Sequence, residues 1–225
     1  MSQLEIIIGN KIYSSWSLRG WLAVKHTGLP MREILLELDT PSFYSELDKY
    51  DVARKVPALI DGDITVWDSA AIIDYCAHIA PEEYWWPEDK AAYAFARSIF
   101  NEMHSGFTQI RTHMPMNLKG RWHGLTFSEP LQTELNRVEK LFTQSRENYG
   151  VDGSFLFGDF SAADMMFAPL ATRLDTYGVK LNTPVRAYVD AILSHPYFTI
   201  WKAEALKENT IVAFDQLPND VQHLG

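Results

Sequence analysis

Every segment with strand-like patterning lies in the first eighty residues, and this uneven distribution limits the fold more than any other feature. Leu4 to Ile8 is a short β-branched run closed by Gly9-Asn10, which predicts a buried strand. Alternating side chains predict a second strand at residues 34–38, and residues 58–66 predict a hairpin around Asp61-Gly62-Asp63. Helical spacing is found between these strands at residues 17–25, 41–50 and 69–77. This order indicates a small α/β domain with a mixed sheet.

Only helical patterns remain after residue 85. They cover residues 90–114, 128–149, 161–177, 183–194 and 196–206. A stretch rich in proline and acidic side chains precedes them, which is typical of a connector between domains. We therefore expect an α/β domain at residues 1–81, a linker at 82–89 and an all-helical domain at 90–225.

The charge distribution disfavours nucleic acid and anionic membranes as partners. The chain carries 20 basic and 29 acidic residues, a formal net charge of −9. Residues 1–80 hold 7 basic and 11 acidic side chains and the remainder 13 and 18, so the negative charge is spread over both parts. Phosphate backbones and anionic lipids require a basic face, which this distribution does not predict.

The single cysteine, Cys76, excludes an internal disulfide and a cysteine-based zinc cage. His113 and His123 have no acidic or cysteine neighbour at ligand spacing, so no metal is expected. Residues 1–5 lack the basic and apolar regions of a signal peptide, and no apolar run approaches the 18 residues that span a bilayer. A cytoplasmic location is expected.

Three short motifs suggest a binding site. The first, Tyr13-Ser14-Ser15-Trp16-Ser17-Leu18-Arg19, precedes a predicted helix, where a serine either caps the helix or places its hydroxyl beside amides that favour an anion. The second is Val56-Pro57-Ala58-Leu59, with proline at the first position of a strand. The third is Trp67-Asp68-Ser69, which is either an ordinary helix cap or a carboxylate and hydroxyl that hold the charged groups of an amino acid.

Taken in this order, the motifs resemble those of the cytosolic glutathione transferases, and the resemblance covers both domains. It implies a thioredoxin-like N-terminal domain, an all-α helical-bundle C-terminal domain, glutathione as co-substrate and a homodimer. Val56, before a cis Pro57, would pair through its backbone with the cysteinyl unit of glutathione. Asp68 and Ser69 would hold its γ-glutamyl end, although the family usually carries Glu or Gln at the position of Asp68.

The family fold also places Lys55 near the glycyl carboxylate of glutathione, with Lys11 and Lys49 as further candidates. Residues 14–19 resemble the S-S-C-x-x-R motif of the zeta class, whose best-known members are maleylacetoacetate isomerases. The two serines and Arg19 match, whereas Trp16 stands at the cysteine position. This departure affects the isomerase interpretation more than glutathione binding.

The implied chemistry is activation of a thiol for attack on an electrophile. A free thiol has a pKa of about 8.5, and lowering it by about two units takes roughly 2.7 kcal/mol. We expect Ser14 or Ser15 to donate to the sulfur, with Ser14 preferred from the zeta-like register. Arg19 would add positive potential or pair with an acid.

The electrophile pocket is expected beside the first long helix of the second domain. Met103, His104, Phe107 and Arg111 are spaced three or four residues apart, which fits either core packing or a ligand wall, with Trp16 as a further aromatic wall. An unpaired Arg111 would favour an anionic acceptor. His104 would be a general acid or a structural histidine.

A fourth resemblance, Gly158 to Met165, is structural. Ser161 and Asp164 have the spacing of a capping box, with apolar residues 160 and 165 as a hydrophobic staple. Losing this box should impair folding rather than binding.

Two alternatives to the transferase remain at this stage, and a third is nearly excluded. The first is a glutathione-dependent cis-trans isomerase of the maleylacetoacetate type. The second is a non-catalytic protein that keeps the fold to bind partners or hydrophobic ligands. The third, a disulfide-exchange enzyme, is disfavoured because Cys76 lies far in sequence from the Ser14-Ser15-Trp16 motif.

Overall fold

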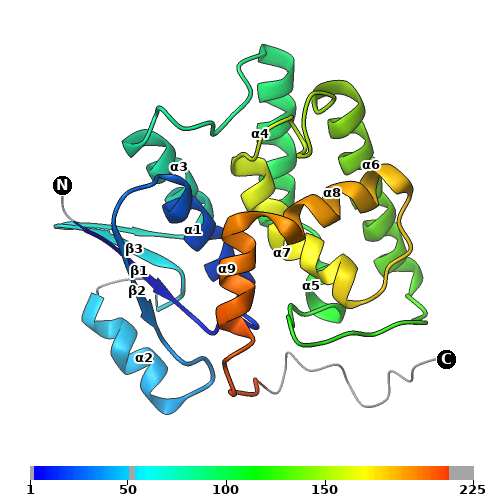
Figure 1. Ribbon diagram of the computed structural model, residues 1–225. Helices are drawn as coiled ribbons and strands as arrows, with labels where there is room; N and C mark the ends of the chain where they lie inside the picture. Colours follow the sequence, from blue (N-terminus) through cyan, green and yellow to red (C-terminus); the bar gives the residue numbers. More distant parts are fainter. Residues whose placement is uncertain (1–2, 51–53, 213–225) are drawn as a thin grey trace.

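The computed structural model describes residues 3–50 and 54–212 (Figure 1). Its N-terminal part contains a four-stranded sheet in the order β2-β1-β3-β4, in which β1 runs parallel to β2 and antiparallel to β3. The strands are β1 (Leu4–Ile8), β2 (Met31–Leu35), β3 (Ala58–Asp61) and β4 (Ile64–Trp67). This mixed sheet, with helices between its strands, confirms the predicted thioredoxin-like domain.

Helices cover both faces of the sheet. One face packs against α1 (Ser15–His26) and α3 (Ser69–Ile79), which lie side by side. The other face packs against α2 (Pro41–Leu47), followed by a single 3₁₀ turn at Asp48–Tyr50. Because β1 carries buried side chains on both faces, its sequence is an almost continuous apolar run.

The second strand differs from the predicted one. It was expected at residues 34–38, whereas it begins at Met31 and ends at Leu35. Its parallel register with β1 pairs Leu4 with Met31 and Ile8 with Leu35, and β1 ends there. Leu36 is buried and its N–H makes a last bond to the Ile8 carbonyl at 2.8 Å, beyond which the chain has no strand partner in β1, so the alternation of residues 34–38 alone placed the strand too late.

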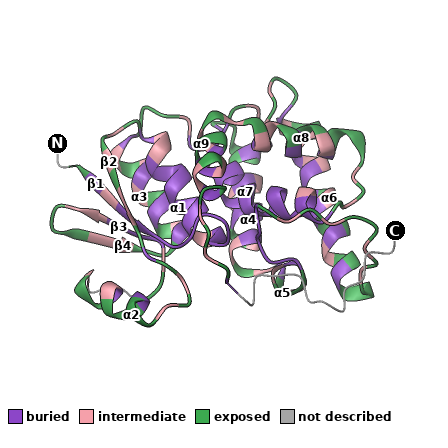
Figure 2. Cartoon of the chain, turned by 60° about the horizontal axis from the view of Figure 1, so that its bottom comes forward, coloured by how far each residue is buried: buried purple, intermediate pink, exposed green. Residues whose placement is uncertain are grey.

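The C-terminal part is helical, as predicted. Its helices are α4 (Lys90–Ser105), α5 (Thr108–His113), α6 (Glu129–Tyr149), α7 (Ala162–Thr176), α8 (Thr183–Ser194) and α9 (Pro196–Ala205). Helix α7 is buried over nearly its whole length and packs against α1, α4 and α8 (Figure 2). None of the helices in the described part of the chain combines the length and apolar character needed to cross a bilayer.

The predicted single helix over residues 90–114 is wrong, because the chain breaks between α4 and α5. Gly106 has extended backbone angles and Phe107 has a φ of 57°. A Cβ on Gly106 would meet the carbonyl oxygen of Glu102 at 2.8 Å, so only glycine fits this turn. The break moves Arg111 onto a separate helix.

The predicted capping box begins α7. Asp164 is fully buried, and its carboxylate accepts hydrogen bonds from the backbone N–H of Ser161 at 3.0 Å and of Leu156 at 3.1 Å. The Ser161 hydroxyl donates to the same carboxylate at 2.8 Å. Burial raises the pKa of Asp164 to about 6, although these hydrogen bonds oppose the rise.

Lys11 links α9 to the sheet domain through ion pairs. Its buried ammonium forms ion pairs with Glu33 on β2 and Glu204 on α9, and its carbonyl accepts from the Trp201 indole at 2.9 Å. These contacts occupy Lys11, so it is not available for the glycyl carboxylate of a ligand. Lys49, the other weaker candidate, forms an ion pair with Glu46 and does not line the cavity described next.

Candidate active site

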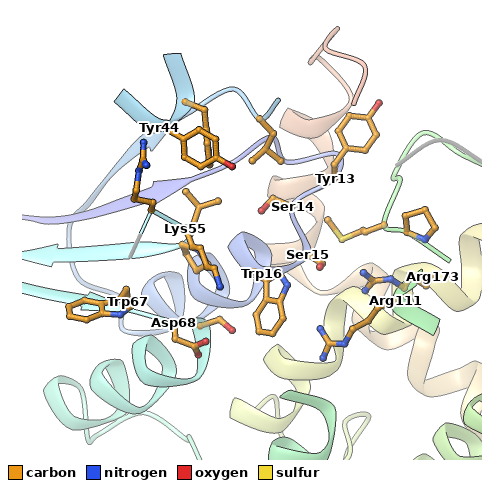
Figure 3. Close-up of a pocket in the computed structure, with 18 residues that line it drawn as sticks. Tyr13, Ser14, Ser15, Trp16, Tyr44, Lys55, Trp67, Asp68, Arg111 and Arg173 are labelled. Carbon is orange, nitrogen blue, oxygen red and sulfur yellow. The ribbon is translucent and has the colours of Figure 1, made fainter. Parts of the chain in front are cut away.

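A cavity of about 780 Å³ lies where the sheet domain meets the helical part (Figure 3). The sheet domain contributes the turn before α1, the segment before β3 and the turn between β4 and α3. The helical part contributes Arg111, Pro115, Met116 and Arg173. In Figure 3 the start of α1 lies between Lys55 and Asp68 on one side and Arg111 and Arg173 on the other.

Ser14 and Ser15 both line this cavity at the N-terminus of α1. Ser14 is the N-cap residue, and its hydroxyl donates to the Ser17 hydroxyl at 2.7 Å and accepts from the Ser17 N–H at 3.4 Å. The buried Ser17 hydroxyl in turn accepts from the Gly9 N–H at 3.0 Å. The Ser15 hydroxyl forms no hydrogen bond with any residue that the structure describes. The capping interpretation therefore holds for Ser14, and Ser15 has a free hydroxyl beside the cavity.

The segment before β3 forms the second wall. Lys55, Val56 and Pro57 line the cavity, and the Val56–Pro57 peptide bond is cis. Helix α1 approaches this segment at Gly20, where a Cβ would come within 2.9 Å of the Pro57 ring. Because glycine permits this contact, α1 and the proline turn are packed directly against each other.

Asp68 and Ser69 line the cavity at the start of α3. Asp68 has a φ of 73°, and its Oδ1 caps the helix by accepting from the Ala70 N–H at 2.8 Å. The Ser69 hydroxyl is fully buried and has no hydrogen-bond partner among the described residues. A buried hydroxyl without a partner is unfavourable. It therefore indicates a place where a polar ligand atom completes the structure.

Arg19 does not line the cavity. Its side chain is fully buried behind Trp16, with the guanidinium carbon 4.7 Å from the centre of the ring, and its Nε donates to the Met166 carbonyl at 2.9 Å. Its other two nitrogens have no partner within the described residues, so the acid pair considered from sequence is not formed. Burial, with Arg111 and Arg173 nearby, lowers the pKa of Arg19 well below its usual value. Arg19 therefore has no direct contact with the cavity.

The predicted electrophile wall is only partly present. Trp16 and Arg111 line the cavity, whereas Met103 and Phe107 are buried in the helical core and do not. His104 lies beside the cavity wall, edge-on to Trp16 with ring centres 5.3 Å apart. The predicted stripe fails because the helix breaks at Gly106, before Arg111.

Arg111 is not the unpaired guanidinium that the sequence suggested. Its Nε donates to the Gly106 carbonyl at 2.8 Å, and its Nη2 donates to the carbonyls of Met103 and His104. These bonds satisfy the C-terminal end of α4. The guanidinium still lies 4.9 Å from the centre of the Trp16 ring and keeps its positive charge at the cavity wall.

The lining residues that sequence reasoning missed include Leu38, Phe43, Tyr44 and Arg54 on the sheet side and Pro115, Met116 and Arg173 on the helical side. Arg173 reaches the wall from the last turn of α7, where its Nε donates to the Met114 carbonyl at 2.7 Å. Its position depends on the crossing of α7 with the 114–116 segment. No local sequence motif indicates the contact between α7 and the 114–116 segment.

Cys76, the single cysteine of the chain, lies on α3. Cys76 is buried in α3 and does not line the cavity, and burial raises the pKa of its thiol to about 12, which disfavours the reactive thiolate. Residues 3–50 and 54–212 contain no cluster of three or more His, Cys, Asp or Glu side chains arranged to hold a metal ion.

Comparison with known proteins identifies relatives for both parts of the chain. Residues 13–79 match the family model described as the N-terminal domain of glutathione S-transferase. Maleylacetoacetate isomerase from Rattus norvegicus is 27% identical over 172 residues, covering 75% of this chain and 76% of that protein. Glutathione S-transferase theta-1 from Mus musculus is 23% identical over 193 residues, covering 80% and 74%.

Solved structures share the fold over most of the chain. A glutathione transferase homologue from Burkholderia, crystallised with bound glutathione, superposes with a TM-score of 0.70 at 20% identity, covering 92% of this chain and 100% of that one. A Tau-class glutathione S-transferase from mango, Mangifera indica, gives a TM-score of 0.67 at 17% identity, covering 91% and 94%. At these identities, the structures establish the two-part fold.

Proposed function

We propose that the chain belongs to the glutathione S-transferase family and resembles its zeta class. We further propose that it binds glutathione in this cavity. Bound there, glutathione would be held as its thiolate for attack on a small electrophile. One observation carries the proposal: a single cavity is lined by the serines at the start of α1, the Lys55–Pro57 segment and the Asp68–Ser69 pair.

Each end of glutathione has a matching group in this arrangement. The carboxylate of Asp68 and the unpartnered hydroxyl of Ser69 suit the ammonium and carboxylate of the γ-glutamyl unit. The backbone of Val56 is assigned to the cysteinyl unit. Lys55 is exposed at the rim and is assigned to the glycyl carboxylate.

The hydroxyls at the start of α1 are assigned to the sulfur. If the Ser17 hydroxyl rotates to donate to Ser14, the Ser14 proton is freed for the sulfur, and the chain from Gly9 N–H through both hydroxyls strengthens that donor. A hydrogen bond to a charged acceptor contributes about 1.5–3 kcal/mol, and a helix N-terminus adds about 0.3–1 kcal/mol. Together they reach the roughly 2.7 kcal/mol that lowers a thiol pKa by about two units.

In the reaction, the thiol releases its proton to solvent and the sulfur lone pair forms a bond to the electrophilic carbon. In a substitution the leaving group departs with its bonding pair, and in an addition the π pair moves to the neighbouring atom, which takes up a proton from solvent. We assign Ser14 as the primary donor and Ser15, whose hydroxyl is free, as the second. Trp16, Arg111 and Arg173 form the wall that the electrophile meets, and the two cations favour an acceptor with negative charge. His104 supports this wall, and Arg19 adds positive potential behind Trp16.

The isomerase is retained as a second function because the curated relatives include proteins named maleylacetoacetate isomerase, at 27–28% identity. Addition of the thiolate to a conjugated double bond, rotation and release of the thiolate would use the same serines.

The proposal also includes a homodimer, a cytoplasmic location and the domain limits 1–81, 82–89 and 90–225. Residues 213–225 of the last domain lie outside the described residues.

Calorimetric titration tests the proposal. Glutathione and an S-methyl glutathione are each titrated into the wild type and a Ser14→Ala, Ser15→Ala double variant. We expect the wild type to bind both, and the variant to lose affinity mainly for the free thiol as the pH rises. Binding without turnover on an electrophile panel or on maleylacetoacetate would support the non-catalytic alternative. Absence of binding to either ligand would refute the proposal.

A further inference from the structure

His104 connects the two halves of the cavity, although it was not expected to contact the glutathione side. It lies in the last turn of α4, and its backbone carbonyl accepts from Arg111 Nη2 at 3.2 Å. Its ring crosses to the sheet domain, where Nε2 lies 3.5 Å from Asp68 Oδ1. One residue thus contacts both the electrophile wall and the carboxylate assigned to the γ-glutamyl end.

The position of the Asp68 carboxylate needs such support. Its side chain is one methylene shorter than that of a glutamate, and Oδ1 is already directed toward the Ala70 N–H. Both the cap and His104 act on Oδ1, whereas Oδ2 forms no hydrogen bond within residues 3–50 and 54–212. With Oδ1 held on this side, Oδ2 remains available for an ammonium group.

The surroundings of His104 keep its ring neutral near pH 7. Burial lowers the pKa of His104, Asp68 opposes this by raising it, and Arg19 and Arg111 lower it further. These groups come from every element that packs charged side chains against the ring: the start of α3, α1 and α5. A neutral ring with its proton on Nε2 attracts Asp68 through its N–H dipole without cancelling the carboxylate charge.

We propose that His104 is a positioning residue that orients Asp68 toward the γ-glutamyl ammonium of glutathione, and that protonation of His104 weakens glutathione binding. A protonated ring competes with the ammonium for the same carboxylate, and a bound ammonium in turn opposes protonation of the ring. This inference rests on the proposed function, because it assumes that Asp68 meets the γ-glutamyl end.

The test is calorimetric titration of the full chain with S-methylglutathione between about pH 5 and pH 7. This probe has no thiol, and its carboxylates and amine titrate at about 3–4 and about 8, so the ligand charge hardly changes in that range. The variants are His104→Gln, which keeps an N–H donor but cannot be protonated, and His104→Ala, which removes the donor. His113→Gln, an exposed histidine on α5, is the matched control.

Wild type and the His113 control should bind about threefold to tenfold more weakly at about pH 5 than at about pH 7, following a single protonation. His104→Gln should keep most of the affinity at pH 7 and lose the pH dependence. His104→Ala should bind about fivefold more weakly at pH 7, because the ring N–H dipole that lies 3.5 Å from the Asp68 carboxylate is lost.

Two results overturn the inference. One is a pH profile of His104→Gln that matches the wild type, and the other is full affinity in His104→Ala at pH 7. If instead the wild type itself fails to bind S-methylglutathione, the proposed function fails, and the two failures are thereby distinguished.

Discussion

Replacing Ser14 by alanine removes two interactions at the start of α1. The hydroxyl accepts from the Ser17 N–H and is bonded to the Ser17 hydroxyl, so its loss weakens the N-cap of the helix. An N-cap serine contributes about 1 kcal/mol, and we expect the free energy of unfolding to fall by that amount. The same change removes the donor that we assign to the glutathione sulfur.

The effect on the sulfur should be larger than the effect on the fold. Losing a hydrogen bond to a thiolate costs about 1.5–3 kcal/mol, which corresponds to a rise of about one to two units in the pKa of the bound thiol. Ser17→Ala should produce a smaller rise, because it leaves the Ser14 hydroxyl in place and removes only the group behind it. Ser15→Ala should also raise the pKa, by less than Ser14→Ala.

The pKa of the bound thiol is measured from the ultraviolet absorbance of the thiolate as a function of pH, with glutathione at saturation. Ser128→Ala is the matched control, since Ser128 is the N-cap of α6 without a side-chain cap bond and lies away from the cavity. Denaturant unfolding of each variant separates the stability effect. An unchanged thiol pKa in both Ser14→Ala and Ser15→Ala would refute the assignment of these serines.

Three further predictions test other parts of the structure. Gly20→Ala should raise helix propensity by up to about 1 kcal/mol, yet weaken glutathione binding about severalfold in calorimetry, because the new Cβ displaces Pro57. Lys11→Met should lower the free energy of unfolding by about 1–3 kcal/mol in urea by breaking the ion pairs with Glu33 and Glu204, the second of which is partly exposed, while glutathione affinity stays at the wild-type value. Asp164 has a folded-state pKa of about 6 against 3.8 unfolded, so its contribution to stability is present below about pH 4 and is lost as the pH rises through about 6. Relative to Asp164→Asn, the wild type should therefore lose up to about 3 kcal/mol of unfolding free energy between those pH values, and parallel pH curves for the two proteins would contradict the raised pKa.

Local patterns were sufficient to predict the sheet domain and the sides of the cavity that it forms. The β-branched run at the start, the Asp-Gly turn of the hairpin and the serines before α1 each act over a few residues, and each occurs where expected. The boundaries of β2 were not predictable in this way. They depend on where β1 ends, because β2 extends only as far as it can pair with β1. The sequence of β2 alone does not specify that partner.

The helical side of the cavity was predicted less well, for a related reason. Helical spacing continues through Gly106 and Phe107, and this spacing outweighed the stop signal of Gly106, where α4 ends. The last backbone carbonyls of α4 need hydrogen-bond donors, and the Arg111 guanidinium donates to them from α5. Arg111, which the sequence suggested as an unpaired ligand group, therefore caps the C-terminal end of α4. Its charge lies at the cavity wall because the cap holds the guanidinium there.

A contact between segments distant in the sequence also positions the start of α1 relative to the helical part. Pro169 has no backbone N–H, so the carbonyl of Met165, four residues earlier, lacks the helical hydrogen bond that position 169 would otherwise donate. The Met166 carbonyl, in that turn, accepts from Arg19 Nε. Because Arg19 is four residues after Ser15 on the same helix, this bond sets the direction in which the serines of α1 face the cavity. The bond between the proline-containing helix α7 and the buried arginine of α1 thus ties the start of α1 to the helix that carries Arg173.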